Sequence, residues 1–277
     1  MFMISSRTRT LQSAKYLQKK RKKTILTASL AVLCVGICLA AIVLVFRLPF
    51  FQITTVKLEN PGSLPANEVE KKALALTEGK YLGLIPRSSS FFYPKDAILA
   101  SVTDAYKRID TIRVVRKSFS TLEITMSERK PEAIVCEGFR EEDQIDECFF
   151  TDEDGYVYAG SPGFSDGVYP RYYVSDSENP ILGTNFIDTK IFKELQSFVK
   201  GLRANGVSTL GILIGEEGSY ELYMKNSDQS TAVVYFDDRV PFDKSMTNLL
   251  AFWESTKDNF NYINLRFGNN VFFSIKQ

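Results

Sequence analysis

One stretch of the chain restricts its architecture more than any other. Residues 24–46 read TILTASLAVLCVGICLAAIVLVF and include no charged side chain. As an α-helix this stretch is long enough to cross the roughly 30 Å hydrocarbon layer of a bilayer. The apolar core of a signal peptide is shorter, about 7 to 15 residues, and no small-x-small cleavage site precedes the FRLPFF that follows. The sequence therefore predicts an uncleaved transmembrane helix at 24–46.

Basic residues next to this stretch predict its orientation. The run KKRKK at 19–23 adjoins the apolar stretch, whereas Arg47 is the single basic residue just beyond it. The positive-inside rule then places residues 1–23 in the cytoplasm as a basic tail and everything after Arg47 outside. We expect a single-pass type II protein of the plasma membrane. A basic tail is also typical of nucleic-acid binding, but beside a span it sets topology and attracts anionic lipid.

Composition excludes several classes of function. The chain has no histidine, which removes Ser-His-Asp and Cys-His nucleophile pairs and imidazole metal ligands. Eight of its 34 basic residues lie in 1–23, which leaves 26 against 33 acidic residues. The mildly acidic main body argues against a nucleic-acid surface.

Two of the four cysteines lie on the predicted external side. Cys34 and Cys38 fall inside the apolar stretch, where they act as small apolar residues. Cys136 and Cys148 bracket the acidic segment EGFREEDQIDE, in a compartment that permits oxidation. A disulfide between them is a hypothesis, because the geometry that it needs cannot be read from sequence.

The first external region has a mixed pattern. Alternating residues predict a strand at 51–60, and helical spacing predicts helices at 65–79 and 93–109, the second with Tyr106 and Ile109 on its inner face. Alternation on both sides of the turn at 116–120 predicts two antiparallel strands. The predicted order is strand, helix, helix, strand, strand.

This order, together with IRVVRKSFSTLEITMSERKPEAIV at 112–135 just outside one span, resembles the POTRA domain of the bacterial cell-division family FtsQ/DivIB. Residues shared with the family pattern are Val114, Val115, Arg116, Thr121, Leu122, Ile124, Glu128, Arg129 and Pro131. The chain departs at Phe119, where the family commonly has proline. The resemblance implies a POTRA-like domain at 50–131.

The resemblance extends over the remaining chain. FFTDEDGYVY at 149–158 and ENPILGTNF at 178–186 are similar to family segments, and YINLRF at 262–267 resembles the family's iDLRY with Asn264 for aspartate. Helical spacing predicts helices in the region of 189–206 and at 243–255. Between them, alternating runs at 209–214, 220–224 and 231–236 predict strands. We therefore expect an α+β protein in which 132–277 form a mixed, β-rich FtsQ/DivIB-type domain with two helices.

Charged clusters have structural explanations. Glu128, Arg129 and Lys130 cannot converge on one atom, because adjacent residues on a strand point to opposite faces. The run 152–155, DEDG, lacks the ligand spacing of a calcium loop and is typical of a tight turn. The acids at 137–147 indicate a solvated loop, with a weaker option of meeting a basic partner or cation. No catalytic set, cofactor motif or metal site is expected, and the chain is predicted not to be an enzyme.

The resemblance implies a divisome scaffold at the division septum. Its partners would be the membrane-anchored FtsB/DivIC and FtsL, in a role that helps couple constriction to septal peptidoglycan synthesis. Strand addition at 269–275 is the expected mechanism. Alternation places Val271, Phe273 and Ile275 on one face and Phe272 on the other, where it either faces outward or packs under a loop. Phe267, Asn269 and Asn270 are assigned to partner binding through the resemblance alone.

Two alternatives belong to other classes. One is a membrane-anchored extracytoplasmic sensor or enzyme that uses the POTRA-like part as a spacer, which would require polar groups converging on an apolar cavity. The other is a POTRA of an outer-membrane assembly protein, which a helical span and the lack of a series of roughly ten-residue barrel strands oppose.

Overall fold

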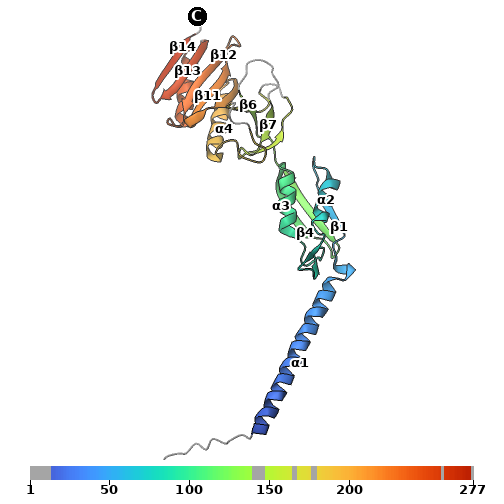
Figure 1. Cartoon of the computed structure of the whole chain (residues 1–277). Helices are drawn as coiled ribbons and strands as arrows, with labels where there is room; N and C mark the ends of the chain where they lie inside the picture. The colour runs from blue at the N-terminus through green and yellow to red at the C-terminus, as the bar shows by residue number, and fades with distance from the viewer. Residues whose placement is uncertain (1–13, 139–146, 164–166, 176–179, 257–258, 276–277) are drawn as a thin grey trace, which may run out of the picture. The chain divides into compact units, whose positions relative to one another are not determined.

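The structure is a computed structural model that describes residues 14–138, 147–163, 167–175, 180–256 and 259–275 (Figure 1). The chain forms two compact units. The first comprises Met1–Val102 and Arg113–Thr125, and the second comprises Thr103–Ile112 and Met126–Gln277. The described residues contain five α-helices and a large β-sheet, which confirms the expected α+β class.

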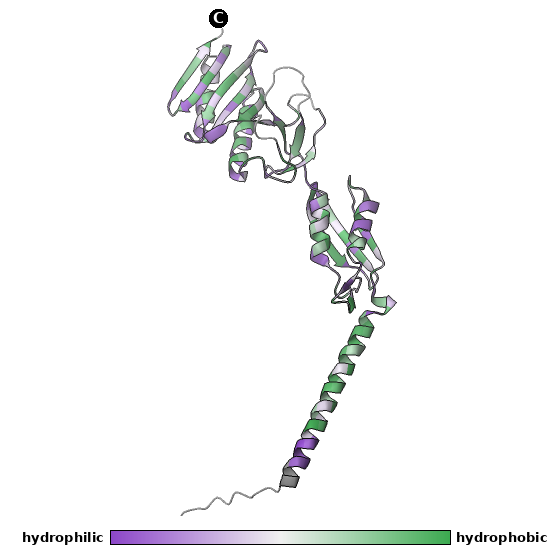
Figure 2. Cartoon of the chain, viewed as in Figure 1, coloured by the Kyte–Doolittle hydropathy of each residue, from purple (hydrophilic) through white to green (hydrophobic). Residues whose placement is uncertain are grey.

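Helix α1, Ala14–Phe46, contains the apolar stretch (Figure 2). Its segment Gln18–Phe46 has a mean hydropathy of 2.9 in its most apolar window and is long and apolar enough to cross a membrane. The helix begins before the predicted span, because Lys, Arg and Gln are good helix formers and continue it on the polar side. The first 13 residues of the basic tail lie outside the described residues.

A small sheet in the strand order β1-β5-β4 lies mostly in the first unit. Strand β1 (Thr55–Glu59) runs parallel to β5 (Thr121–Glu128), which follows β4 (Ile109–Arg116) through a short turn. Helices α2 (Ala66–Ala75) and α3 (Lys95–Ala105) lie between β1 and β4 in the chain. The buried side chains of these elements include Val56, Leu58, Val69, Ala73, Ile98, Val102, Val114, Leu122 and Ile124.

Two details of this unit differ from the sequence prediction. Helix α3 ends at Ala105, so Tyr106 is outside it and Ile109 begins β4 as a buried strand residue. The segment between α2 and α3, for which the sequence pattern predicted no strand, forms a hairpin of β2 (Lys80–Tyr81) and β3 (Ile85–Pro86). Such short strands carry no recognisable alternation, and their pairing depends on the turn between them. A 3-10 turn, Pro49–Phe51, follows α1.

The second unit is built on a nine-stranded sheet with the order β14-β13-β12-β11-β10-β9-β6-β7-β8. Its strands are β6 (Ala133–Glu137), β7 (Cys148–Thr151), β8 (Val157–Gly160), β9 (Arg171–Val174), β10 (Thr209–Ile214), β11 (Ser219–Lys225), β12 (Thr231–Asp237), β13 (Phe260–Phe267) and β14 (Asn270–Ile275). Neighbours pair in parallel at β6 with β9, β9 with β10 and β12 with β13, and antiparallel elsewhere. A 3-10 turn, Glu216–Gly218, leads into β11.

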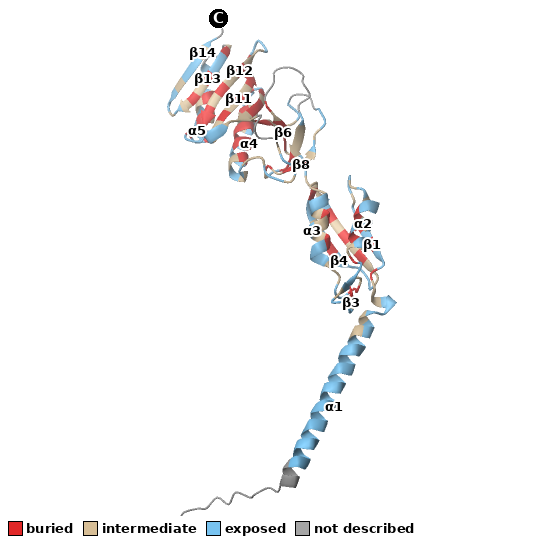
Figure 3. Cartoon of the chain, in the orientation of Figure 1, coloured by how far each residue is buried: buried red, intermediate tan, exposed pale blue. Residues whose placement is uncertain are grey.

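Two helices share one apolar core with this sheet. Helix α4 (Thr189–Ala204) begins at Asp188, whose carboxylate accepts hydrogen bonds from the backbone amides of Lys190 and Ile191. Helix α5 (Phe242–Thr256) contacts α4. The core joins alternate residues of the central strands to the inner stripes of both helices, as the buried residues in Figure 3 show.

Candidate partner-binding site

The predicted partner-binding strand lies at one end of the nine-stranded sheet. Among the described residues, β14 pairs with β13 alone, in an antiparallel hairpin that aligns Asn264 with Phe272 and Ile263 with Phe273. Phe267 ends β13 opposite Asn270, and Asn269 lies in the turn, one residue before the strand. An edge strand of this kind presents backbone N–H and C=O groups along its outer side.

The side chains of β14 leave much apolar surface exposed on both faces. Phe272, Phe273 and Ile275 have exposed fractions of 53%, 44% and 46%. Val271 packs against the core, and the ring of Phe273 lies 4.7 Å from that of Phe252 on α5. These residues therefore occupy the helix-covered face, as alternation predicted.

Phe272 lies on the opposite face, which the two helices do not cover. Its ring contacts Phe267 edge-on at a centroid distance of 5.1 Å and remains half exposed, so it is outward rather than packed beneath a loop. The register continues from Phe272 through Asn264 to Tyr235 on the same face. The edge and this row form a continuous, partly apolar surface.

Two tyrosines that the sequence pattern did not single out, Tyr235 and Tyr262, extend that surface. Tyr262 is exposed and lies 6.2 Å from Tyr235, ring centroid to ring centroid. The guanidinium of Arg266 lies 5.4 Å from the centre of the Tyr235 ring, while Asn264 Oδ1 accepts hydrogen bonds from the backbone amide and Nε of Arg266. The inward positions of Ile263 and Leu265 were the available signal, because their neighbours on a strand must point outward.

Side chains of α5 contact the β13–β14 hairpin on its buried face. Phe260 is fully buried, with ring contacts to Phe252 at 5.4 Å and to Trp253 at 5.8 Å. The side-chain amide of Asn248 on α5 donates to the carbonyl of Gly268 in the turn at 2.9 Å. The edge is thus exposed on its outer side and fixed on its inner side.

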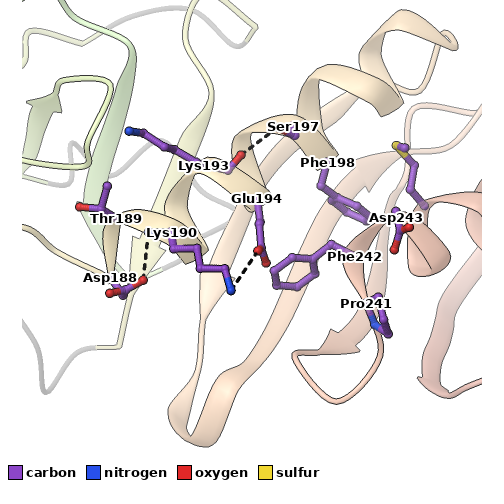
Figure 4. Close-up of a pocket in the computed structure, with 11 residues that line it drawn as sticks. Asp188, Thr189, Lys190, Lys193, Glu194, Ser197, Phe198, Pro241, Phe242 and Asp243 are labelled. Carbon is purple, nitrogen blue, oxygen red and sulfur yellow. Dashed lines mark hydrogen bonds and ion pairs between the residues drawn. The ribbon is translucent and has the colours of Figure 1, made fainter.

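A groove of about 880 Å³ lies along α4 and the start of α5 (Figure 4). Phe198, Phe242 and Met246 supply its apolar lining. Lys190 on the rim is 3.9 Å from Glu194, Nζ to Oε1. Lys193 donates to Asp154 at 2.6 Å, and this hydrogen bond raises the pKa of the Lys193 ammonium above its usual value. Both lysines of the rim are therefore paired, Lys190 with Glu194 of the same rim and Lys193 with Asp154 outside it.

Charged residues within 128–130 and 152–155 make contacts that stabilise the fold. Arg129 forms an ion pair with Asp152, and its guanidinium lies 4.2 Å from the centre of the Tyr156 ring. Asp152 Oδ1 also accepts from the backbone amides of Asp154 and Tyr156, so this carboxylate shapes the turn between β7 and β8. No group of metal-ligating side chains is found in the part of the chain that the structure describes.

The cysteine pair lies between neighbouring strands. Cys136 on β6 and Cys148 on β7 are directly opposite in register and are joined by a disulfide. The acids between them at 139–146 lie outside the described residues. Of the cluster, only Glu137 and Glu147 fall within the description.

Comparison with known proteins adds no relative. A scan of the chain against models of protein families finds no match, and a search of curated proteins finds none either.

Proposed function

We propose that the chain is a cell-division scaffold of the FtsQ/DivIB type, anchored in the plasma membrane by α1 with its N-terminus in the cytoplasm. In this proposal the β1-α2-α3-β4-β5 elements form a POTRA-like domain and the nine-stranded sheet carries the partner site. The external part holds FtsB/DivIC-like and FtsL-like membrane proteins at the septum and helps couple constriction to septal peptidoglycan synthesis. No catalytic role, cofactor or nucleic acid is included.

The observation that carries this proposal is the open edge strand β14. It combines an unoccupied outer side, among the described residues, with exposed apolar side chains on both faces. A partner strand that pairs there satisfies backbone groups and covers Phe272 on one face and Phe273 on the other. Each new backbone hydrogen bond contributes a net of about 0.5–1.5 kcal/mol, and the aromatic rings add buried area. Strand addition would thus use both the open backbone groups and the exposed apolar side chains of β14.

The test is co-purification of the full chain with the FtsB/DivIC-type protein of its own source organism. We expect Phe272→Glu combined with Phe267→Ala to abolish capture, because the double change removes the ring pair and places a charge beside the added strand. Val168→Glu is the matched control, since Val168 is an exposed apolar residue of the same unit outside β14. Undiminished capture by the double variant would refute the site.

The cellular role has its own readout. Depletion of the protein should give filaments or cells without septa, and a fluorescent fusion should collect at midcell. Normal septa after depletion would contradict a role in division, whatever the binding assay shows.

The groove along α4 favours a second candidate, an extracytoplasmic sensor that binds a small apolar ligand in the groove lined by Phe198 and Phe242. Normal division in depleted cells together with ligand-dependent thermal stabilisation would support this candidate over the scaffold. The mutual pairing of Lys190 and Glu194 on the rim makes it the weaker of the two.

A further inference from the structure

A second exposed apolar surface lies in the first unit, beside the end of α1. We call it the Phe–Leu surface and define it by six exposed residues: Leu48, Phe50, Leu82, Leu84, Phe91 and Phe92. Exposed apolar residues gathered around one hairpin and one helix end are typical of a contact surface rather than a solvated one.

The β2–β3 hairpin presents the most exposed of these side chains. Leu82 at its tip has an exposed fraction of 97%, and its backbone φ is +48°. A bulky residue at positive φ is uncommon and unfavourable. Glycine follows it at position 83, so the chain places leucine where a polar turn residue would be the ordinary choice. The tip is built to project an apolar side chain.

The surface is continuous with the apolar helix. Phe46, the last residue of α1, contacts the rings of Phe91 and Phe92 at centroid distances of 5.7 and 5.0 Å. Arg47 Nε donates to the carbonyl of Leu84 at 3.0 Å and ties the hairpin to the helix end. The uncharged stretch that ends at Phe46 spans about 35 Å as a helix, slightly more than the hydrocarbon layer. Phe46 would then lie at the lipid–water boundary.

The charges around the surface match lipid headgroups. The segments 47–52 and 78–95 contain Arg47, Lys80, Arg87 and Lys95 against one acid, Glu78. Long basic side chains beside apolar residues reach phosphates while their stems stay in the apolar layer, and aromatic residues concentrate at the same depth. Aromatic rings next to the Phe–Leu surface pack within the unit, since the ring of Phe51 lies 5.1 Å from that of Phe119. The ring of Phe50 also contacts Phe51 at 5.1 Å and Phe119 at 5.4 Å. Phe50 and Leu82 nevertheless keep exposed fractions of 67% and 97%.

We propose that the Phe–Leu surface docks into the interfacial layer of the bilayer that α1 spans, with Leu82 and Phe50 among the acyl chains and Arg47, Lys80 and Arg87 at the phosphates. This inference rests on the membrane anchoring included in the proposed function. It goes further by assigning the first unit a second membrane contact, which holds that unit against the lipid instead of leaving it tethered by one helix.

The experiment uses the full chain reconstituted in phosphatidylcholine–phosphatidylglycerol vesicles that contain lipid brominated in the upper acyl chain, a contact quencher of tryptophan. Leu82→Trp and Phe91→Trp test the surface, Leu30→Trp reports on α1, and Lys72→Trp on α2 is the exposed control. The parent chain, whose one tryptophan is Trp253 in the second unit, supplies the background.

We expect brominated lipid to reduce the fluorescence of Leu82→Trp and Phe91→Trp by a fraction comparable to that of Leu30→Trp, with no loss for Lys72→Trp. Quenching of Leu30→Trp alone would overturn the docking surface and leave the anchor intact. No quenching at Leu30→Trp would overturn the anchor and, with it, both proposals. Quenching at Leu82→Trp and Phe91→Trp that is blocked by a co-reconstituted division partner would assign the surface to that protein instead.

The basic rim is tested by omitting phosphatidylglycerol. We expect weaker quenching of Leu82→Trp in neutral vesicles than in anionic ones. Lowering the ionic strength should strengthen the quenching in anionic vesicles and leave it unchanged in neutral vesicles. Equal quenching in both vesicle types would overturn the role assigned to Arg47, Lys80 and Arg87.

Discussion

The two edge strands of the nine-stranded sheet differ in how far other segments of the chain cover them. At the β8 end, the segment 183–186 follows the outer side of the strand: the amide of Val157 donates to the carbonyl of Thr184 at 2.9 Å, and the amide of Gly183 donates to the carbonyl of Val157 at 2.8 Å. Tyr156 and Asn185 form a further bridge. At the β14 end no such segment lies alongside in the part of the chain that the structure describes (Figure 3).

This difference supports the proposal that the β14 edge receives a partner. An uncovered strand edge promotes unwanted pairing, so proteins usually cover or shorten it. The same sheet covers β8 with its own chain and buries Val157 and Tyr158 there. The exposed state of β14 is therefore not a general property of this sheet, which is why we assign the partner to that end.

The largest expected effect tests how the open edge is supported. Phe260→Ala removes a fully buried ring of β13 itself and should lower the free energy of unfolding by about 3–5 kcal/mol. Denaturation of the full chain in detergent, followed by the fluorescence of Trp253, measures it. Tyr262→Ala on the exposed face of the same strand is the control and should cost clearly less. Equal losses would show that the edge does not depend on the core below it.

The second test concerns the covered end. Reducing the Cys136–Cys148 disulfide, whose cysteines are 12 residues apart, should lower stability by about 2–3 kcal/mol through the greater freedom of the unfolded chain. Denaturation with and without reductant measures the change. A Cys34→Ala, Cys38→Ala background should show the same loss, because those thiols are free. If the reduced chain also lost partner capture, the two ends would be coupled, contrary to the contrast drawn above.

The third test uses pH to probe burial at β8. Burial raises the pKa of Tyr158 from 10 to about 12, so the folded state keeps this phenol neutral where the unfolded state ionises it. The stabilisation of the folded state by this neutral phenol is fully present below pH 10. It falls by about 2 kcal/mol as the pH rises from 10 to 12. Tyr158→Phe should flatten the fall in stability over that range. Parent and variant curves that fall in parallel would argue against a buried Tyr158.

The smallest effect tests the covering segment itself. Gly183 has φ +91°, so Gly183→Ala should strain this segment by about 1–2 kcal/mol and speed hydrogen exchange at the Val157 amide. Gly160→Ala, with no positive φ and open space at its Cβ position, is the matched control and should change stability by less than about 0.5 kcal/mol. Unchanged exchange at Val157 in the Gly183 variant would mean that the cover does not depend on this turn.

Much of the fold was predictable because its signals are local. Helical spacing located α2, α4 and α5, and alternation located β1 and the strands β10 to β12. Strand β9 was missed because its four residues are too short for a period and its partners are parallel strands far along the chain. The Phe–Leu surface was missed for a related reason, since the β2–β3 hairpin and Phe91 each meet the end of α1 only through contacts between separate segments of the chain.

In the candidate partner site, too, the sequence pattern located some residues and missed others. Alternation in 270–275 was sufficient to separate Phe272 from Val271 and Phe273, because successive strand residues must face opposite sides. It did not reveal Tyr235 or Tyr262, which reach the same surface through pairing of β12 with β13. Local pattern predicts which way a side chain points, while sheet order decides which other side chains lie beside it.

By itself, the sequence determined the apolar helix at 24–46, the α+β class and the inner and outer residues of the longer strands. Each of these depends on spacing along a few turns or a few strand residues, which is a local property. The tertiary structure alone decided that β14 is an open edge, that the segment 183–186 covers β8, and that Leu82 projects beside the end of α1. These depend on pairing between distant segments, whose choice reflects the burial and hydrogen bonding of the whole sheet rather than any single stretch.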